Sequence, residues 1–282
     1  MDLGLIEPVA VRSDTLPPAM HTNAVLVGRD PVWIVDPGSP DREENERLAQ
    51  QLARRNVGGI VLTHRHRDHV AGATMLAALL GAPILAHAIT AEELRGKVKI
   101  DRTLAEGDAL PLGGDREAQI LFTPGHARGH IVLWEPVSRA LVLGDMVAGI
   151  GSVLISAPDG DVALYLRSLA RLRALEPKTL YPAHGPVIEP GVAKLDEYIA
   201  HRNKREHDIY MAVAGAGGGV SLGSVVDVVY ATTPAFLRPW AMRSASAHLD
   251  KLLGEGRVSL RSGAREDISV YEETARFEVS RG

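Results

Sequence analysis

The chain has 282 residues, a length that accommodates one large domain or a core domain with an appendage. Hydrophobic residues make up 45% of it and charged residues 23%, which is a globular composition and excludes general disorder. A formal net charge of −4 excludes a global positive field that would attract nucleic acid or an anionic membrane. The chain has no cysteine, so any metal must be held by imidazole and carboxylate groups.

The N-terminal segment lacks the pattern of a secretory signal peptide. Asp2 and Glu7 stand where such a peptide needs positive charge, and no continuous apolar segment follows them. No window reaches the roughly 20 apolar residues that a membrane-spanning helix needs. We therefore expect a soluble, cytoplasmic protein without a membrane partner.

The first part of the chain predicts alternating strands and helices. In chain order the pattern predicts strands at 23–28 and 32–35, a helix at 41–55 that ends at Gly58-Gly59, a strand at 60–63 and a helix at 70–80. The segment HRHRDH at 64–69 therefore falls in a loop between a strand end and a helix start. Layered α/β folds place their chemistry at such positions.

From Pro83 the pattern changes to short strands separated by glycine and proline, which predicts a second sheet. Its expected strands are ILAHA, LAEGDALPLGG, QILF, HIVLW and ALVLGD, and they are followed by an amphipathic helix at 161–175 and a strand at 179–181. Two strand-rich halves, each flanked by helices, predict an α/β fold of the four-layer αββα sandwich type.

The last third of the chain predicts a separate small unit. A long charged helix at 192–213 and a glycine-rich break at 215–219 precede predicted helices at 222–230 and 234–253 and strands at 258–261 and 268–272. Helix, helix and β-ribbon is the order of a winged helix. We expect a catalytic domain at 1–190, a connecting helix and glycine-rich break at 191–219, and a winged-helix-like domain at 220–282.

The strongest chemical signal is His64-Arg65-His66-Arg67-Asp68-His69. Four potential ligands lie within six residues. If the side chains alternate, His64 and His66 face one ion while Asp68 and His69 face a second. The alternative is a polar, solvated loop, because short motifs also occur by chance.

Three further strand ends offer ligands. His126 follows the strand QILF in PGHARGH, Asp145 follows an apolar strand in LGDM, and His184 follows a strand in PAHGP. An ordinary strand-terminating aspartate is the alternative for Asp145 alone. Four strand ends that all offer ligands favour a metal site.

These motifs together resemble the metallo-β-lactamase superfamily, and the resemblance covers about residues 20–190. It implies that the first ion takes His64, His66 and His126, that the second takes Asp68, His69 and His184, and that Asp145 bridges them. Asp36 in VDPG matches the position that usually supports the metal loop, and His130 is expected to orient a ligand. The absence of cysteine departs from secreted β-lactamases and matches the ligand set of hydroxyacylglutathione hydrolases.

The implied chemistry is hydrolysis at two metal ions. Two cations about 3.5–4 Å apart lower the pKa of a shared water to roughly 7, so a metal-bridging hydroxide can attack a carbonyl or phosphoryl group. By the same resemblance, Asp68 is expected to be the catalytic carboxylate that orients the nucleophile or takes its proton. Two zinc ions suit the ligands first, and iron or manganese can occupy the same shell.

Residues 145–262 resemble the branch that includes β-lactamase-like protein 2, an endoribonuclease acting on single-stranded RNA, and related fungal thioesterases. We expect a small acyl substrate (a thioester, ester or lactam) because the chain is acidic and only 4% aromatic, which leaves little for RNA to stack on. The alternatives are an endoribonuclease or phosphodiesterase acting on single-stranded RNA, and a non-enzymatic nucleic-acid-binding module with structural metals. Structural sites are normally closed by four ligands, which argues against the module.

Two features of the C-terminal third stay open. Arg202 and Arg205 on the long helix are expected on a solvated face, as such residues usually are. The alternative is that they border the mouth of the active site, where they bind substrate by attracting an anionic group. The winged helix packs on the catalytic domain or forms a homodimer, and the sequence does not distinguish these roles.

Overall fold

The structure is a computed structural model that describes residues 5–267 and 269–280. Asp2, used above to exclude a signal peptide, and Ile268, the first residue of the second predicted ribbon strand, lie outside the described residues. Within the described residues, no helix is both long enough and apolar enough to cross a membrane.

The first sheet has six strands, which lie side by side in their sequence order. They are β1 (Ile6–Arg12), β2 (His21–Val27), β3 (Val32–Val35), β4 (Val57–Leu62), β5 (Ile84–His87) and β6 (Arg102–Leu104). The β1–β2 and β2–β3 pairs are antiparallel, whereas β3 to β6 run parallel. Parallel neighbours need crossover connections, and helices supply them here.

The second sheet has five strands, in the order β11-β10-β9-β8-β7. They are β7 (Ala109–Gly113), β8 (Arg116–Phe122), β9 (Ile131–Glu135), β10 (Ala140–Gly144) and β11 (Thr179–Pro182). Only the β10–β11 pair in this sheet is parallel. The ligand-bearing ends of β10 and β11 therefore lie at the same edge of the sheet.

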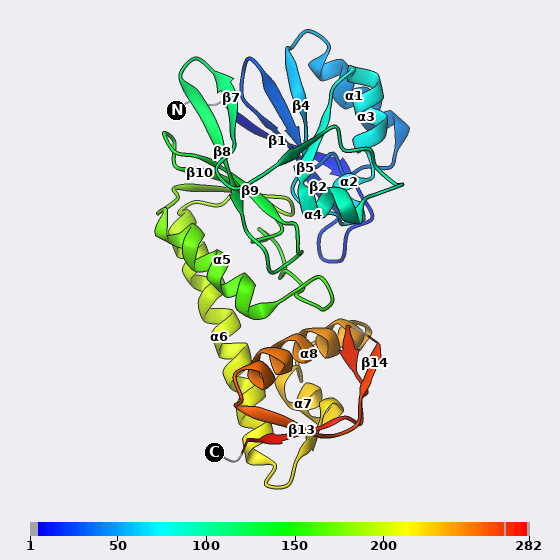
Figure 1. Cartoon of the computed structure of the whole chain (residues 1–282), viewed down its shortest axis with the longest axis vertical. Coiled ribbons are helices and arrows are strands. Elements are labelled where there is room, and N and C mark those ends of the chain that lie inside the picture. Colours follow the sequence, from blue (N-terminus) through cyan, green and yellow to red (C-terminus); the bar gives the residue numbers. More distant parts are fainter. Residues whose placement is uncertain (1–4, 268, 281–282) are drawn as a thin grey trace.

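Three apolar layers lie between the sheets and helices of the sandwich. Along β2, Val25 and Val27 pack between the two sheets, whereas the alternate residue Leu26 packs toward the helices α1 (Arg42–Leu52) and α3 (Ala73–Leu80). On the far side, helices α5 (Val162–Ala174) and α6 (Gly191–Gly215) cover the second sheet, with Tyr165 and Leu195 in the shared core. The order helix, sheet, sheet, helix is the predicted four-layer sandwich (Figure 1).

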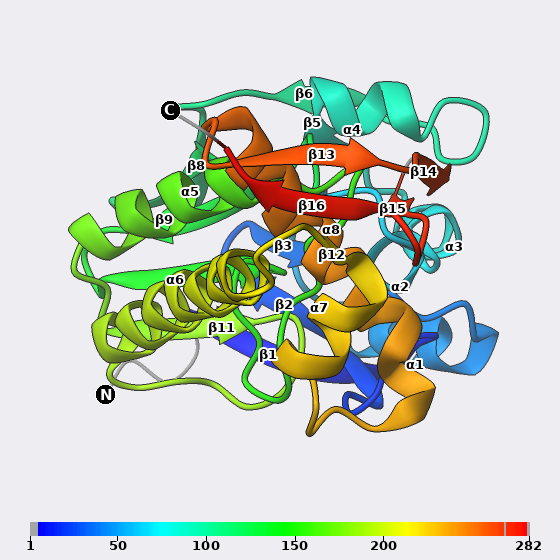
Figure 2. The same cartoon turned by 90° about the horizontal axis from the view of Figure 1, so that it is seen from below.

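The C-terminal unit has its own core around Phe277. It contains α7 (Leu222–Val229), a 3-10 turn (Ala235–Leu237), α8 (Arg238–Gly254) and the strands β12 (Val220–Ser221), β13 (Val258–Ser262), β14 (Arg265–Asp267), β15 (Val270–Tyr271) and β16 (Arg276–Val279). Helix α6 runs from the sandwich into this unit, and α8 lies on the side that faces the sandwich (Figure 1). Figure 2 shows β13 and β16 side by side, as their antiparallel pairing requires.

The structure corrects several expectations. Gly58-Gly59 does not end the first helix but lies inside β4, where a Cβ would meet the indole of Trp33 at Gly58 and the side chain of Leu85 at Gly59. The ILAHA strand belongs to the first sheet as β5. The partner of β13 is β16, and not the segment expected at 268–272.

Several elements were not predicted, among them α2 (Arg67–Val70), α4 (Ala88–Glu93) and the strands β1, β6, β12, β14 and β16. Strand β1 lies at the edge of its sheet, and most of its residues are exposed or half-buried, so it lacks a strong apolar pattern. Helix α2 places Asp68 and His69 on a single turn, where the sequence had suggested an irregular loop.

Candidate metal centre

The candidate ligands come from loops at the ends of strands in both sheets. His64 follows β4, and Asp68 and His69 lie on α2. In the second sheet His126 lies in the β8–β9 loop, whereas Asp145 and His184 follow β10 and β11. The fold brings these loops together, because the ligand atoms form compact groups that mix residues from both sheets.

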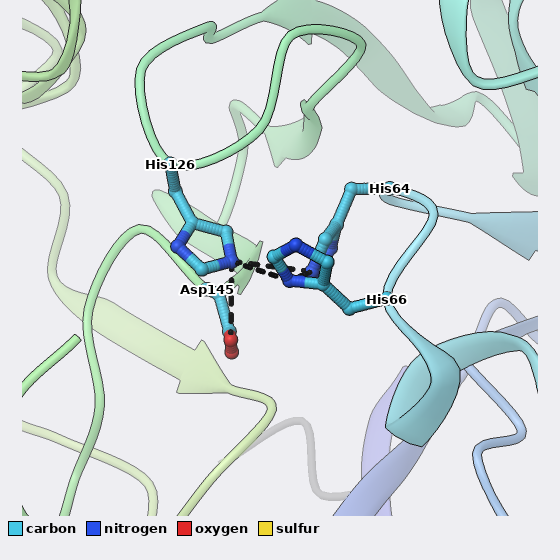
Figure 3. A group of neighbouring side chains, drawn as sticks. All are labelled: His64, His66, His126 and Asp145. Carbon is cyan, nitrogen blue, oxygen red and sulfur yellow. Dashed lines mark hydrogen bonds and ion pairs between the residues drawn. The ribbon is translucent and has the colours of Figure 1, made fainter. Parts of the chain in front are cut away.

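The first group consists of His64, His66, His126 and Asp145, whose ligand atoms all lie within 4.8 Å of one another. Nδ1 of His66 lies 2.9 Å from Nε2 of His64 and 3.0 Å from Nε2 of His126. Figure 3 shows the rings of His64 and His66, from the loop that follows β4, pointing toward the ring of His126 from the β8–β9 loop, with the carboxylate of Asp145 below His126. One ring nitrogen of each of the three histidines therefore faces the same small space.

Hydrogen bonds on the outer side of each ring decide which nitrogen carries the proton. His126 donates from Nδ1 to the carbonyl oxygen of Leu154 at 3.0 Å, and His66 donates from Nε2 to Asp159 at 3.0 Å. His64 donates from Nδ1 to the hydroxyl of Thr63 at 3.0 Å. The nitrogen that faces the centre is then the unprotonated one in each ring, as a metal ligand requires.

The second group consists of Asp68, His69 and His184. His184 donates from Nδ1 to the backbone oxygen of His21 at 3.1 Å, so its Nε2 faces inward, 3.4 Å from Oδ2 of Asp68. His69 donates from Nδ1 to Asp36 at 2.8 Å and turns its Nε2 inward as well. In both groups, a hydrogen bond from the outward-facing ring nitrogen therefore orients each histidine.

Asp145 lies between the two groups. Its Oδ1 is 3.5 Å from Nε2 of His69 and 3.4 Å from Nε2 of His184, whereas its Oδ2 is 3.5 Å from Nε2 of His126. One oxygen therefore faces the second group and the other faces the first. Asp145 therefore lies within reach of the ligands of both groups.

The residues present fit a divalent cation in each group. Within the described part of the chain, Nε2 of His69 and Oδ1 of Asp145 are buried and have no hydrogen-bond partner, which is costly unless something else satisfies them. Ligand nitrogens about 2.0–2.1 Å from a tetrahedral ion lie about 3.4 Å apart, close to the spacings seen here. Imidazole and carboxylate ligands also suit zinc, iron and manganese.

Asp36 and Thr63 form the support beneath the centre. Asp36 is buried and accepts hydrogen bonds from the backbone nitrogen of Thr63 at 2.7 Å and from its hydroxyl at 2.6 Å. Its backbone has a φ of 52°, a left-handed conformation that aspartate tolerates better than most residues. One carboxylate thereby connects His69 to the end of β4.

His130 has both ring nitrogens engaged outside the ligand groups. Its Nε2 accepts a hydrogen bond from the backbone nitrogen of Asp145 at 3.1 Å, so its Nδ1 donates to the hydroxyl of Thr123 at 2.9 Å. The ring therefore holds the backbone of Asp145 in place and offers no lone pair to a metal.

The pKa shifts follow from burial and from the mixture of histidines and acids. Burial raises the pKa of Asp68, but the hydrogen bond to His184 and the charge of His69 outweigh it and lower the pKa to about 2. Burial and the neighbouring His66 lower the pKa of His126 to about 4. At neutral pH Asp68 is therefore ionised and His126 is neutral, the forms that bind cations.

His69 behaves differently. Burial opposes its positive charge, but the charges of Asp145 and Asp36 prevail and raise its pKa well above the ordinary value. A cation that binds its Nε2 must displace the proton held there, so metal binding at the second group is coupled to proton release.

The sequence did not single out Asp159. Its carboxylate is 8% exposed, lies 3.0 Å from Nε2 of His66 and 2.8 Å from the guanidinium of Arg65, and accepts from the backbone nitrogen of Arg128 at 3.0 Å. Asp159 stands in a long loop with no motif. The only available signal was that a histidine ligand usually has an acceptor for its other nitrogen.

A cavity of about 1100 Å³ opens over the metal centre. Its wall includes Asp68 and His126 from the sandwich, Arg202 and Arg205 from α6, and Trp240 from α8. The two arginines therefore border the cavity, and Arg202 is 3% exposed rather than on a solvated face. The C-terminal unit forms part of the cavity wall.

Comparison with known proteins agrees with this geometry. Residues 17–184 match the family model described as "Metallo-beta-lactamase superfamily". The chain belongs to the metallo-beta-lactamase superfamily. It is accordingly an enzyme of the hydrolase class, and its His/Asp groups can hold a metal. Residues 221–265 match the beta-lactamase associated winged helix domain, which confirms the predicted C-terminal fold.

Relatives within the superfamily carry different names. A beta-lactamase-like protein 2 homolog of Drosophila melanogaster is 30% identical over 90% of this chain and 89% of its own. An atrochrysone carboxyl ACP thioesterase of Aspergillus fumigatus is 24% identical over 76% of this chain and 70% of its own. A hydroxyacylglutathione hydrolase of Rhodospirillum rubrum is 40% identical, over 47% of this chain and 50% of its own.

A solved structure shows the same fold over the whole length. A metallo-beta-lactamase family protein of Thermus thermophilus superposes with a TM-score of 0.74 and 22% identity, covering 98% of this chain and 99% of that one. The superposition therefore includes both the sandwich and the C-terminal unit.

Proposed function

We propose that this protein is a dinuclear metal-dependent hydrolase that cleaves an acyl bond (a thioester, ester or lactam) in a small substrate. The observation that carries the proposal is the position of Asp145, with one oxygen toward His69 and His184 and the other toward His126. A site for a single ion needs no carboxylate shared between two groups of ligands.

His64, His66 and His126 would hold a first ion, Asp68, His69 and His184 would hold a second, and Asp145 would be shared between them. When bound, two zinc ions, or iron or manganese in their place, lower the pKa of a coordinated water and polarise the scissile carbonyl. The chain itself holds each histidine in the correct tautomer through Thr63, Leu154, Asp159, His21 and Asp36.

Asp68 is the proposed catalytic residue. Its carboxylate lines the cavity, and its pKa of about 2 keeps it ionised throughout the neutral range. An ionised carboxylate accepts a hydrogen bond from the attacking water and orients it toward the carbonyl.

The cavity favours a small acyl substrate. Beside the ligands its wall carries apolar side chains, among them Leu16, Ile150, Phe236 and Trp240, and Phe236 is 67% exposed. A pocket with a polar reacting centre and apolar walls suits an acyl chain. The relatives named as a thioesterase and as a hydroxyacylglutathione hydrolase point to the same class of bond.

We also propose the domain boundaries given by the sequence, at residues 190 and 220. Helix α6 supports a connecting role because its first half contributes Leu195 and Tyr198 to the core of the sandwich. Its second half contributes Ile209 and Val213 to the core of the C-terminal unit. The helix therefore joins the two cores rather than belonging to one.

A substrate panel tests the proposed reaction. Metal-loaded protein is assayed against an acyl thioester, a lactone, a β-lactam, bis-p-nitrophenyl phosphate and single-stranded RNA, beside Asp68→Ala and His126→Ala. We expect hydrolysis of an acyl substrate that both substitutions abolish. Cleavage of RNA alone, or of the phosphodiester alone, would show that the acyl assignment is wrong.

A further inference from the structure

Two arginines of α6 face the cavity one turn apart. Arg202 and Arg205 are three positions apart in α6, so they lie on the same side of the helix. Both side chains line the cavity together with the ligands of the metal centre. Lys204 lies between them in sequence but not in the cavity wall, and it pairs with Asp208 at 2.7 Å. Lys204 therefore points away from the cavity and pairs with an acid, whereas Arg202 and Arg205 face the cavity.

Arg202 is buried without a carboxylate. Its guanidinium donates to the backbone oxygen of Val153, lies 3.5 Å from the hydroxyl of Ser152 and is 5.4 Å from the ring of Tyr165. Its Nε is buried and has no hydrogen-bond partner among the described residues. Burying a charge without an opposite charge is costly, so a buried and unpaired guanidinium calls for an anion.

Arg205 is half-buried and also lacks a carboxylate partner among the described residues. It donates to the backbone oxygen of Val229 and stacks 4.3 Å from the ring of Tyr230. Across residues 5–267 and 269–280, neither arginine forms an ion pair with a carboxylate. The nearest acid along the helix, Glu206, is already engaged by Lys251 at 2.8 Å and by Arg257 at 3.1 Å.

The acids of the cavity wall are also occupied. Asp68 and Asp145 belong to the metal centre, and Asp159 is held by Arg65 and His66. The remaining two are Asp14, which lies 3.3 Å from Arg67, and Asp267, which accepts from Ser269 and lies 4.0 Å from Arg243. No acid of this wall is left to neutralise the pair on α6.

The positive charges of Arg202 and Arg205 also affect the neighbouring residue His201. His201 precedes Arg202 on the same helix and also lines the cavity. Burial lowers the pKa of His201, and the charges of Arg202 and Arg205 lower it further. Both guanidinium groups therefore contribute positive charge near His201, as does Lys204, whereas Glu197 acts in the opposite direction.

From this geometry we propose that Arg202 and Arg205 form an oxyanion-binding subsite for a carboxylate or phosphate that the substrate carries away from its scissile bond. The proposal rests on the acyl hydrolase function. Planar guanidinium groups bind both kinds of oxyanion through paired hydrogen bonds. The subsite adjoins the metal centre, because Arg202 bonds to Val153 and the next carbonyl, that of Leu154, accepts from His126.

Three thioesters separate the sources of the oxyanion. A hexanoyl thioester of N-acetylcysteamine is neutral, its adipoyl counterpart adds a carboxylate to the acyl end, and a hexanoyl thioester of phosphopantetheine adds a phosphate to the thiol end. Metal-loaded wild type is expected to prefer one charged thioester over the neutral one. The charged thioester that it prefers identifies whether the carboxylate or the phosphate occupies the subsite.

The arginines are tested with Arg205→Gln and Arg202→Gln beside the matched control Lys204→Gln. In the two arginine variants kcat/KM for the preferred charged thioester should fall by about tenfold or more, mainly through KM, with little change for the neutral thioester. Lys204→Gln should change neither. If the neutral and charged thioesters lose activity equally, the arginines are structural and the subsite is refuted. Arg205→Gln keeps the test valid even if Arg202→Gln disturbs the loop that contains Val153.

A binding measurement separates this subsite from the proposed reaction. Inorganic phosphate is titrated calorimetrically into the metal-loaded wild type and the same variants, so any direct binding to the metals is common to all. The subsite predicts a Kd about tenfold higher in Arg205→Gln than in Lys204→Gln. If no thioester is hydrolysed but this difference persists, the acyl function fails while the subsite stands. Equal phosphate affinity in all variants, or weakened binding of RNA alone, overturns the subsite.

Discussion

Nε2 of His66 lies 3.0 Å from the buried carboxylate of Asp159, 93 residues further along the chain. This hydrogen bond fixes the ring of a proposed metal ligand and directs its Nδ1 toward His64 and His126. The loop after β10 is thereby tied to the loop after β4.

Replacement of Asp159 by alanine is expected to weaken metal binding at the first group by about 10- to 100-fold, because carboxylates that orient histidine ligands contribute on this scale. Competition with a chromophoric chelator measures the affinity. Asp161→Asn is the matched control, since Asp161 lies in the same loop but accepts from the backbone nitrogen of Leu164 as the cap of α5. Asparagine caps helices equally well. Equal affinity of Asp159→Ala and wild type would refute the positioning role.

Gly144 is expected to be essential for placing Asp145. Its φ is 49°, and a Cβ at this position would lie 2.6 Å from the hydroxyl of Thr63 and 2.7 Å from Nε2 of His130. Gly144→Ala should therefore displace Asp145 and reduce bound metal in addition to lowering stability.

Gly81→Ala is the control for backbone strain alone, because Gly81 has a φ of 64° and nothing within 4 Å of the added methyl group. It should cost about 1 kcal/mol in the free energy of unfolding and leave metal content unchanged. Denaturant unfolding and metal analysis of both variants give the comparison. Normal metal content in Gly144→Ala would contradict the packing argument.

Glu135 on β9 predicts a pH dependence of stability that is unrelated to the metal centre. Burial raises its pKa, but two hydrogen bonds from Arg116, at 2.9 and 2.6 Å, and others from Ser138 lower the pKa to about 2 from an ordinary 4.5. The folded state therefore favours the ionised form. Its stabilising effect is complete above about pH 4.5 and is lost as the pH falls toward 2.

Glu135→Gln should accordingly lower the free energy of unfolding by about 2 kcal/mol at pH 7, with a difference from wild type that shrinks below about pH 4.5. Urea unfolding across this pH range measures it. Glu117→Gln on the neighbouring strand, where the side chain is exposed, should show almost no effect at any pH. A difference for Glu135→Gln that is independent of pH would exclude the ion pair as its cause.

Much of the fold could be predicted because apolar periodicity follows local burial. The continuous apolar run along β2, which is buried on both faces, and the helical spacing in α5 both reflect where each element meets the core. Strand β1 was missed because an edge strand with exposed residues carries no such pattern. The sheet to which β5 belongs depends on contacts with β4 and β6, which local sequence does not encode.

The candidate ligands could be predicted because each stands in a compact motif at a strand end. Asp159 could not, because its partner His66 is far away in sequence and only the folded loop brings them together. The burial of Arg202 could not be predicted either. The residues around it belong to the segment near Val153 and to the C-terminal unit, which are distant in sequence. Residues that support the ligands act through tertiary contacts, and a single sequence does not show which distant residues will be in contact.

The central claim of two metal ions joined by Asp145 is tested most directly by metal stoichiometry. Wild type and Asp145→Ala are loaded with excess zinc, dialysed to equilibrium and analysed for metal per chain, with circular dichroism to verify folding. The account predicts close to two equivalents for wild type and one or fewer for Asp145→Ala. A wild type that saturates at one equivalent, or binds none, would contradict it.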